Sequence, residues 1–196
     1  MYRTLLAAII FAFSSHAMAK MTIASKDFTD NGKMSKEFSC EGKKVSPELN
    51  WLDVPKAAKT LVLIEIDPDA KSAPSGVFDH WVMFNIPANT KSLPQDAKKL
   101  PAGTMKGRNS MKTNDYVPAC PPTGDHHYVF TLYALDTKLD LPEGATKEQV
   151  LDKLSGHILE QATITGMYQK DHPDVEKPAV AKPAVNVKPA VVNPAH

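Results

Sequence analysis

Four histidines mark the part of this chain that could support chemistry. The sequence has seven histidines, of which one lies in an apolar N-terminal segment and two lie in a proline-rich C-terminal segment. The four that remain are His80, His126, His127 and His157. Imidazole changes its charge near neutral pH, so these side chains could bind an anion, move a proton or ligate a metal ion.

Two carboxylates lie between an apolar run and His80, where strand ends would meet. Asp67 and Asp69 follow the apolar run Leu61–Ile66, and His80 begins the next apolar run, His80–Ile86. If the two runs are neighbouring strands, their adjacent ends bring a carboxylate to an imidazole. We therefore expect Asp67 to orient His80 and to hold up its pKa.

The second histidine cluster lies next to a tyrosine. Residues two apart in a strand share a face, so His126 and Tyr128 are predicted to point together and His127 to point away. The preceding segment, 109–125, is rich in turn-forming residues, and its Pro121-Pro122 pair would make a rigid rim. Imidazoles, a tyrosine hydroxyl and loop amides all donate hydrogen bonds, which suits an anion.

Other readings of these residues stay open. A strand-end Asp often caps a turn, a strand His often packs in a core, and a buried Tyr often closes a core hydrogen bond. Alternatively, Asp67, His80 and His126 could be the ligands of a metal-dependent hydrolase, because two His and one carboxylate can hold a catalytic ion. The sequence contains no His-Glu-x-x-His, Cys-x-x-Cys or Gly-x-Ser-x-Gly motif, which weighs against both metal and nucleophilic hydrolysis.

Strands must position most of these side chains. The near-continuous apolar character of Leu61–Ile66 predicts a central strand covered on both faces. The full set of expected strands is Leu61–Ile66, His80–Ile86 and Tyr128–Leu135, with shorter candidates at Met21–Ser25 and Ala162–Tyr168. The prediction is a mainly β domain.

One helix is expected after Gly144. Thr146 and Gln149 fit a capping box, and apolar residues then recur at helical spacing. These residues are Val150, Leu151, Leu154 and Ile158. His157 would lie on this helix beside the apolar stripe, as a boundary residue. One helix among several strands argues against a doubly wound α/β fold.

Both ends of the chain differ from the middle. Residues 1–19 contain Arg3, the apolar run Leu5–Phe13 and Ala17-Met18-Ala19, which predicts a signal peptide cleaved after Ala19. The alternative is an uncleaved anchor, but this run is shorter than the roughly 20 residues that span a bilayer. Five of the 16 prolines lie in residues 171–196, so we expect a disordered tail, either inert or a docking segment. Residues 20–170 remain as one domain.

Charge and cysteines further limit the function. The chain has 23 Lys+Arg and 22 Asp+Glu, and removal of Arg3 with the leader leaves 22 of each. Bulk charge therefore gives no reason to expect a nucleic-acid partner. Cys40 and Cys120 are the only cysteines, and export to the periplasm or outside the cell favours a disulfide between them over two separate thiols.

Several motifs in order resemble one family. They are Asp67-Pro68-Asp69-Ala70, Asp79-His80-Trp81, Gly107-Arg108-Asn109, Pro121-Pro122 and His126-His127-Tyr128. From about Met21 to Gln169, the sequence resembles the phosphatidylethanolamine-binding protein family, and in particular its bacterial Raf kinase inhibitor-like branch. The resemblance implies a mainly antiparallel β fold with a few peripheral helices. It also implies a small cavity that accepts phosphate-type anions or phospholipid head groups, with no cofactor and no catalytic residue.

The family's site residues can be carried over position by position. Asp67, His80, His126 and Tyr128 match the pocket-lining positions, with Asp69, Cys120 and Pro121 beside them. Two positions depart from the family pattern. Lys71 replaces the proline that usually follows Asp-Pro-Asp-Ala, and Cys120 stands where some relatives have Gly. Relatives modulate kinases or proteases, so a protein-inhibitor or interaction module stays open as an alternative, although kinship of fold does not transfer a particular protein partner.

The resulting prediction is an exported, non-enzymatic binding protein for a phosphate-containing small molecule or lipid head group. Because protonated imidazole binds an anion better, affinity is expected to rise as pH falls from about 8 toward 6. No transmembrane segment is expected once the leader is removed.

Overall fold

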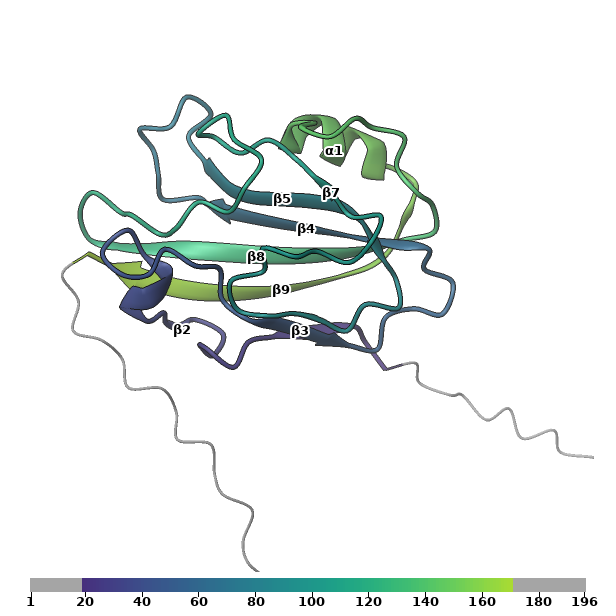
Figure 1. Cartoon of the computed structure of the whole chain (residues 1–196), viewed down its shortest axis with the longest axis horizontal. Coiled ribbons are helices and arrows are strands. Elements are labelled where there is room, and N and C mark those ends of the chain that lie inside the picture. Colours follow the sequence, from purple (N-terminus) through teal and green to yellow (C-terminus); the bar gives the residue numbers. More distant parts are fainter. Residues whose placement is uncertain (1–18, 171–196) are drawn as a thin grey trace, which may run out of the picture.

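Residues 19–170 are described by the computed structural model (Figure 1). The predicted tail, and the predicted leader apart from Ala19, lie outside the described residues. No helix within the described part of the chain is long and apolar enough to cross a membrane.

The described residues form two β-sheets, which confirms the mainly β prediction. The smaller sheet has the strand order β1-β3-β6, and the larger has the order β2-β9-β8-β4-β5-β7. All pairings are antiparallel except that of β2 with β9. The strands are β1 (Thr22–Ala24), β2 (Gly32–Lys33), β3 (Leu49–Leu52), β4 (Thr60–Asp67), β5 (Phe78–Pro87), β6 (Ser92–Leu93), β7 (Met105–Lys106), β8 (Asp125–Leu135) and β9 (Ile158–Gln169).

Strand β4 is the centre of the larger sheet, with β8 on one side and β5 on the other. Its residues alternate between two separate cores. Leu61 and Leu63 belong to a core that includes residues of the smaller sheet, whereas Val62 and Ile64 belong to a core beneath the helix. The prediction of a strand buried on both faces is therefore confirmed.

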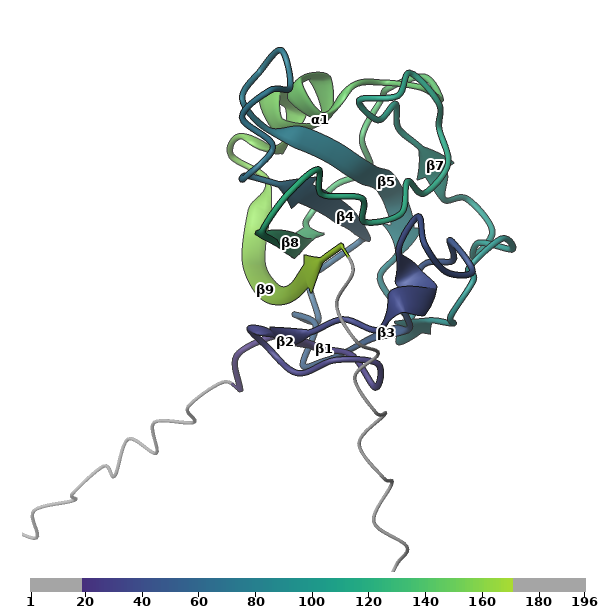
Figure 2. The ribbon, with the colours of Figure 1, turned by 90° about the vertical axis from the view of Figure 1, so that its left-hand side faces the viewer.

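The two covering layers lie on opposite sides of the larger sheet. Helix α1 (Lys147–Leu154) lies on one side, near β5, and β1 and β3 lie on the other (Figure 2). A short 3-10 helix, η1 (Lys36–Phe38), precedes Cys40. Val150 and Leu154 bury the apolar face of α1 in the second core.

The start of α1 was predicted correctly and its end was not. Thr146 is the N-cap, and its reciprocal hydrogen bonds with Gln149 form the expected capping box. The helix ends at Leu154, because Gly156 has a φ of 80° and reverses the chain. Ile158 therefore begins β9 and is 44% exposed, and His157 pairs with Asp136 at 2.9 Å instead of lying on the helix.

The strands extend further than their apolar runs. Strand β9 begins at Ile158 and pairs with β8 over nearly its whole length, although polar residues such as Glu160 and Gln161 occupy its first half. Strand β8 begins at Asp125, which places His126 within the sheet. Hydrogen bonding to a neighbouring strand extended these elements beyond what local composition indicates.

Candidate functional site

Polar side chains are buried where the ends of three adjacent strands meet. Asp67 ends β4, His80 lies near the start of β5, and His126 and Tyr128 lie near the start of β8. Each of these four residues is less than 9% exposed. We refer to Asp67, His80, His126 and Tyr128 as the histidine site.

Asp67 organises this site through both of its carboxylate oxygens. Its Oδ1 accepts hydrogen bonds from the backbone N–H groups of Asp69 at 2.8 Å and Ala70 at 3.2 Å, which closes the turn after β4. Its Oδ2 lies 2.6 Å from Nδ1 of His126. The prediction that Asp67 orients His80 is therefore wrong, because the carboxylate pairs with the histidine on β8.

The sheet register explains which histidine pairs with Asp67. Strands β4 and β8 keep a regular register up to Ile66 and Val129. The register between β4 and β5 shifts by one residue, since Glu65 is opposite Trp81 and Ile66 is opposite Asp79. His80 falls at this irregularity, and a register irregularity re-aims side chains.

His80 instead bonds to a loop backbone. Its Nδ1 lies 2.8 Å from the carbonyl oxygen of Val117 and must carry the proton, because a carbonyl only accepts. Burial lowers the pKa of His80 below its usual value of 6.5, although the Val117 carbonyl and the charge of Asp67 oppose this shift. The charge of Asp67 thus raises the pKa of His80 as expected, but burial outweighs this contribution and the net shift is downward.

Aromatic rings enclose His80. The Phe78 ring centroid is 4.7 Å away, and that of Tyr128 is 5.1 Å away in an edge-on arrangement. The Tyr128 hydroxyl lies near the Cys120 backbone but makes no hydrogen bond of ordinary geometry within residues 19–170. Burial raises the pKa of Tyr128, so the hydroxyl keeps its proton and remains a donor.

Asp69 pairs on the other face of β8. The carboxylate of Asp69 accepts hydrogen bonds from both the backbone N–H of His127 at 2.9 Å and its Nδ1 at 2.7 Å. These hydrogen bonds lower the pKa of Asp69. His127 thus points away from His126, as predicted. Asp69 lies with His127 on that other face and does not face the histidine site.

A disulfide fixes the loop that precedes β8. Cys40 and Cys120 are bonded across a sequence separation of 80 residues, which confirms the predicted pair. The backbone N–H of Cys40 also donates to the carbonyl of Ala119 at 2.9 Å. Pro121, the next residue, is buried, whereas Cys120 is exposed. The link joins the segment after η1 to the loop beside Tyr128.

Glu65 is a buried carboxyl that was not predicted as a site residue from the sequence. It is fully buried, and neither side-chain oxygen has a hydrogen-bond partner within the described residues. Burial, and secondarily the charge of Asp67, raise the pKa of Glu65 well above its usual value. The signal was present, since Glu65 is the one charged residue in the run Leu61–Ile66.

The described residues do not form the three-ligand set that the metal-hydrolase alternative requires. Within residues 19–170, no three His, Cys, Asp or Glu side chains are grouped so that they could hold a metal ion. Asp67 and His126 are directly paired, while His80 is tied by Nδ1 to Val117.

Fold and site together define a two-sheet β domain with a buried carboxylate–imidazole pair at its strand ends. The family model for phosphatidylethanolamine-binding protein matches residues 24–169. The chain therefore belongs to the phosphatidylethanolamine-binding protein family, as its motifs predicted.

Relatives in sequence and structure agree with this assignment. A UPF0098 protein of Methanothermobacter thermautotrophicus is 45% identical over 153 residues, covering 76% of this chain and 99% of that protein. The crystal structure of a putative phosphatidylethanolamine-binding protein homologue from Chlamydia trachomatis matches with a TM-score of 0.73 and 38% identity, over 78% of this chain and 99% of that one. YbcL of E. coli, described as a new member of the mammalian family, matches with a TM-score of 0.70 and 32% identity. This match covers 77% of the present chain and 99% of YbcL.

Proposed function

We propose that the histidine site binds a phosphate-type anion, either on a small phosphate ester or on a phospholipid head group, without turning it over. The observation that carries this proposal is the buried pairing of Asp67 with His126 at 2.6 Å, beside His80 and Tyr128. A buried cluster with several donors is the kind of environment in which an anion is held by charge-assisted hydrogen bonds.

Both histidines use Nδ1 within the protein and so leave Nε2 for a ligand. Nδ1 of His126 faces the Asp67 carboxylate, and Nδ1 of His80 faces the Val117 carbonyl. In a neutral ring the remaining Nε2 is an acceptor, and it becomes a donor only when the ring is protonated. Anion binding should therefore be coupled to proton uptake.

The direction of the pH effect follows from His80. Because burial lowers the pKa of His80 below 6.5, its ring is mainly neutral at pH 7 in the unliganded protein. An anion that binds the protonated ring must bring a proton with it, so affinity rises as pH falls through and below 6.5. The contribution of His80 to the pH dependence therefore extends to lower pH than the predicted range of about 8 to 6.

Calorimetric titration with dimethyl phosphate tests the site. The charge of this phosphodiester does not change between pH 5 and pH 8, so any pH dependence of binding comes from the protein. We expect affinity to increase as pH falls and protons to be taken up, measured by repeating the titration in buffers of different ionisation enthalpy. A pH-independent affinity with no proton uptake would contradict capture by imidazole.

Two histidine variants provide a matched comparison. His126→Gln should lower the affinity for dimethyl phosphate by about tenfold or more, since it removes a charge-assisted donor. His127→Gln lies on the same strand but faces the other way, toward Asp69, and should leave the affinity unchanged. Equal losses in both variants would argue against the histidine site as the binding location.

Further titrations distinguish a small phosphate ester from a lipid head group as the ligand, and they also test for hydrolysis. Phosphoethanolamine represents a small ester, and a short-chain phosphatidylethanolamine represents a lipid head group. Tighter binding of the lipid form would identify the head group as the better ligand. Release of product from either compound, with or without added zinc, would favour the hydrolase alternative instead.

We also infer that the protein is exported. The Cys40–Cys120 disulfide supports this inference, because such bonds persist in oxidising compartments. Expression of the full chain, followed by fractionation and N-terminal sequencing, should yield a periplasmic or secreted protein that begins at Lys20. A cytoplasmic protein that retains its first residues would contradict export.

A further inference from the structure

The buried charges of the histidine site largely cancel one another. Nδ1 of His126 lies 2.6 Å from Oδ2 of Asp67, so the charge of a protonated His126 ring is neutralised by the carboxylate beside it. Tyr128 keeps its proton and is uncharged, because burial raises its pKa. His80 is then the residue of the four whose protonation adds a net positive charge. The site therefore reaches a single net positive charge when both imidazoles are protonated.

Glu65 adds no positive charge to this balance. It lies two residues before Asp67, on the same face of β4. Because Glu65 is opposite Phe130 of β8, Tyr128 is its diagonal neighbour on that face. Burial, and then the charge of Asp67, raise the pKa of Glu65, which keeps the carboxyl neutral to higher pH. The charge of Glu65 also acts on Tyr116, which burial keeps protonated. Ionisation of Glu65 would only add negative charge beside the site.

Within residues 19–170, the histidine site has no fixed cation among its partners. The charges that shift the pKa values of its residues come from carboxyl, imidazole and phenol groups, with no lysine or arginine among them. Lys71, in the turn after Asp67, is exposed and donates to the Pro68 carbonyl at 2.6 Å. Lys147 lies 2.5 Å from Asp79, which neutralises it. The positive charge of the site therefore depends on its imidazoles.

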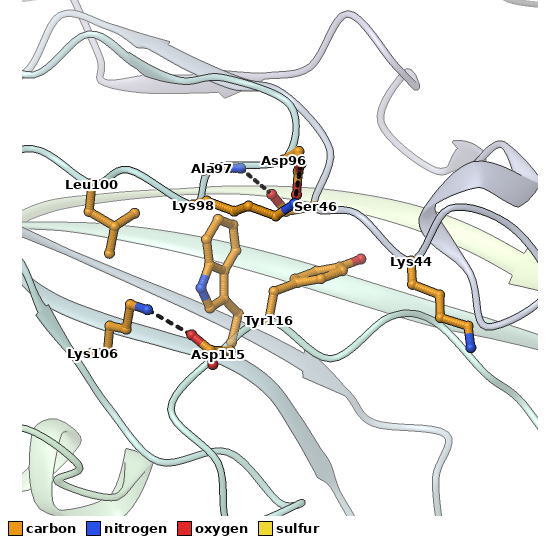
Figure 3. Close-up of a pocket in the computed structure, with 10 residues that line it drawn as sticks. Lys44, Ser46, Asp96, Ala97, Lys98, Leu100, Lys106, Asp115 and Tyr116 are labelled. Atoms are coloured by element: carbon orange, nitrogen blue, oxygen red, sulfur yellow. Dashed lines mark hydrogen bonds and ion pairs between the residues drawn. The ribbon is translucent and has the colours of Figure 1, made fainter.

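Three further lysines lie around a separate pocket of about 290 Å³, whose lining includes none of the four residues of the histidine site. Lys98 lies 3.0 Å from Asp96. Lys106 lies 2.7 Å from Asp115. Lys44 is exposed, and Figure 3 shows its ammonium directed away from this pocket. The cations of this region are thus paired or exposed to water, and they are not part of the histidine site.

A doubly charged ligand would leave the buried site with excess negative charge. One net positive charge balances a monoanion but not a dianion. An unbalanced charge costs far more free energy in a buried site than in water. Phosphate groups with two negative charges are commonly held by Arg or Lys side chains, which supply fixed positive charge. The histidine site is therefore suited to a ligand with a single negative charge.

We propose that the histidine site selects phosphodiesters, which carry one negative charge, over phosphomonoesters, which carry two, and that Asp67 sets this selection by neutralising His126. The inference rests on the proposed function and narrows its ligand class. Phospholipid head groups and soluble phosphodiesters share the selected chemistry. Phosphorylated side chains are monoesters with a charge of about −1.5 to −2 at pH 7, so they are predicted to be poor ligands.

Calorimetric titration of the full chain with dimethyl phosphate and methyl phosphate tests the selection. At pH 7.5 the diester should bind about tenfold or more tightly than the monoester, because only about 3% of a monoester with a second pKa near 6 is then singly charged. At pH 5.5 most of the monoester is singly charged, and the two affinities should differ by less than about threefold. A monoester that binds as tightly as the diester at pH 7.5 would overturn the proposal.

Methyl sulfate separates the effect of charge from that of size. It has the shape of methyl phosphate but carries one negative charge at both pH values. At pH 7.5 its affinity should lie within about threefold of that of dimethyl phosphate, since the two ligands have equal charge. If methyl sulfate binds as weakly as methyl phosphate, the size of the ester sets the preference and the proposal is wrong.

Asp67→Asn tests the residue that sets the selection. Asn keeps an oxygen that can accept from the backbone N–H groups of Asp69 and Ala70, but it cannot neutralise a protonated His126. The ratio of diester to monoester affinity at pH 7.5 should fall by about threefold or more. Asp69→Asn is the matched control, because Asp69 lies in the same turn but bonds to His127 on the other face. Equal changes of the ratio in the two variants would contradict the role of Asp67.

The wild-type titrations distinguish failure of this proposal from failure of the proposed function. If dimethyl phosphate does not bind at all, the proposed function fails and the selection fails with it. If dimethyl phosphate binds but methyl phosphate binds equally well at pH 7.5, the anion site stands and the selection by charge is refuted. The comparison of ligands decides the selection even if Asp67→Asn does not fold.

Discussion

The two faces of strand β4 are both buried, but their residues are suited to different tasks. Val62 and Ile64 face the core beneath α1, where apolar side chains such as Val150 and Leu154 pack together. Leu61 and Leu63 face the other core, and the same face continues to Glu65 and Asp67. One face therefore contributes stability through apolar packing. The other ends in carboxyl groups whose burial costs free energy unless they are paired.

Asp67 and Glu65 show how differently buried carboxyls can be accommodated. Asp67 has two backbone donors and an imidazole as partners, whereas Glu65 has none within residues 19–170. A paired buried carboxylate can stay charged, but an unpaired one avoids the cost of burial by staying protonated. The face of β4 that carries the histidine site thus includes the Asp67 carboxyl, whose hydrogen bonds are satisfied, and the Glu65 carboxyl, which destabilises the fold.

Removing the disulfide should lower the stability of the protein more than any other change considered. The disulfide lies on the side of the larger sheet that carries the histidine site. Cys40→Ser combined with Cys120→Ser should lower the free energy of unfolding by about 4.5 kcal/mol in the loop-entropy model, given the separation of 80 residues. Urea denaturation measures the loss. The control is the wild-type protein in reductant, in which mass spectrometry should confirm two free thiols. If this reduced protein is as stable as the oxidised protein, the prediction is wrong.

Truncation of the helix-side core should have the next largest effect. Leu154→Ala should lower the free energy of unfolding by about 3 kcal/mol, because Leu154 is 2% exposed in the core beneath α1. Leu151→Ala on the same helix is the control, since Leu151 is 38% exposed and should cost much less. Dimethyl phosphate affinity should not change in either variant. A loss of affinity in folded Leu154→Ala would show that the two faces are coupled.

Glu65→Leu should make the protein more stable, by about 2 kcal/mol at pH 7, since it removes an unpaired buried polar group. The gain should depend on pH. Because the folded-state pKa of Glu65 is raised above 4.5, its ionisation destabilises the folded state as pH rises from 4.5 through that higher pKa. Urea denaturation of both proteins from pH 4.5 to pH 8 should show a difference that grows with pH. A constant difference would mean that Glu65 does not titrate in this way.

The smallest effect is expected at the helix cap. Thr146→Ala should cost about 1 kcal/mol, because the Thr146 side chain accepts the backbone N–H of Gln149. Thr123→Ala, in an exposed loop, should change the stability little and serves as the control. Thermal melting resolves the two variants. Equal melting temperatures would show that α1 depends on its buried residues and not on its cap.

Local signals in the sequence predicted much of the fold. The apolar run Leu61–Ile66 predicted the central strand, and the capping box predicted where α1 begins. Both signals act within a few residues of the chain. The end of α1 was predicted too late because Ile158 continues the helical spacing, whereas the backbone turns at Gly156 and Ile158 pairs with Leu135 of β8.

The residues of the histidine site were recognised from motifs, but their pairing was not. Sequence order suggested Asp67 with His80, whereas the structure pairs Asp67 with His126 across 59 positions of sequence. Glu65 was not anticipated, nor was the pocket that is lined by Lys44, Trp81 and Lys98, which come from distant segments.

The sequence by itself therefore determined the family, the mainly β class, the disulfide pair and the residues of the histidine site. These depend on residue types, on motifs in a fixed order and on local periodicity. The tertiary structure decided which carboxylate meets which imidazole, in which direction the pKa of His80 moves, and which distant residues line a pocket outside the histidine site. Each of these depends on register between strands and on burial, and both arise only when segments far apart in the chain pack together.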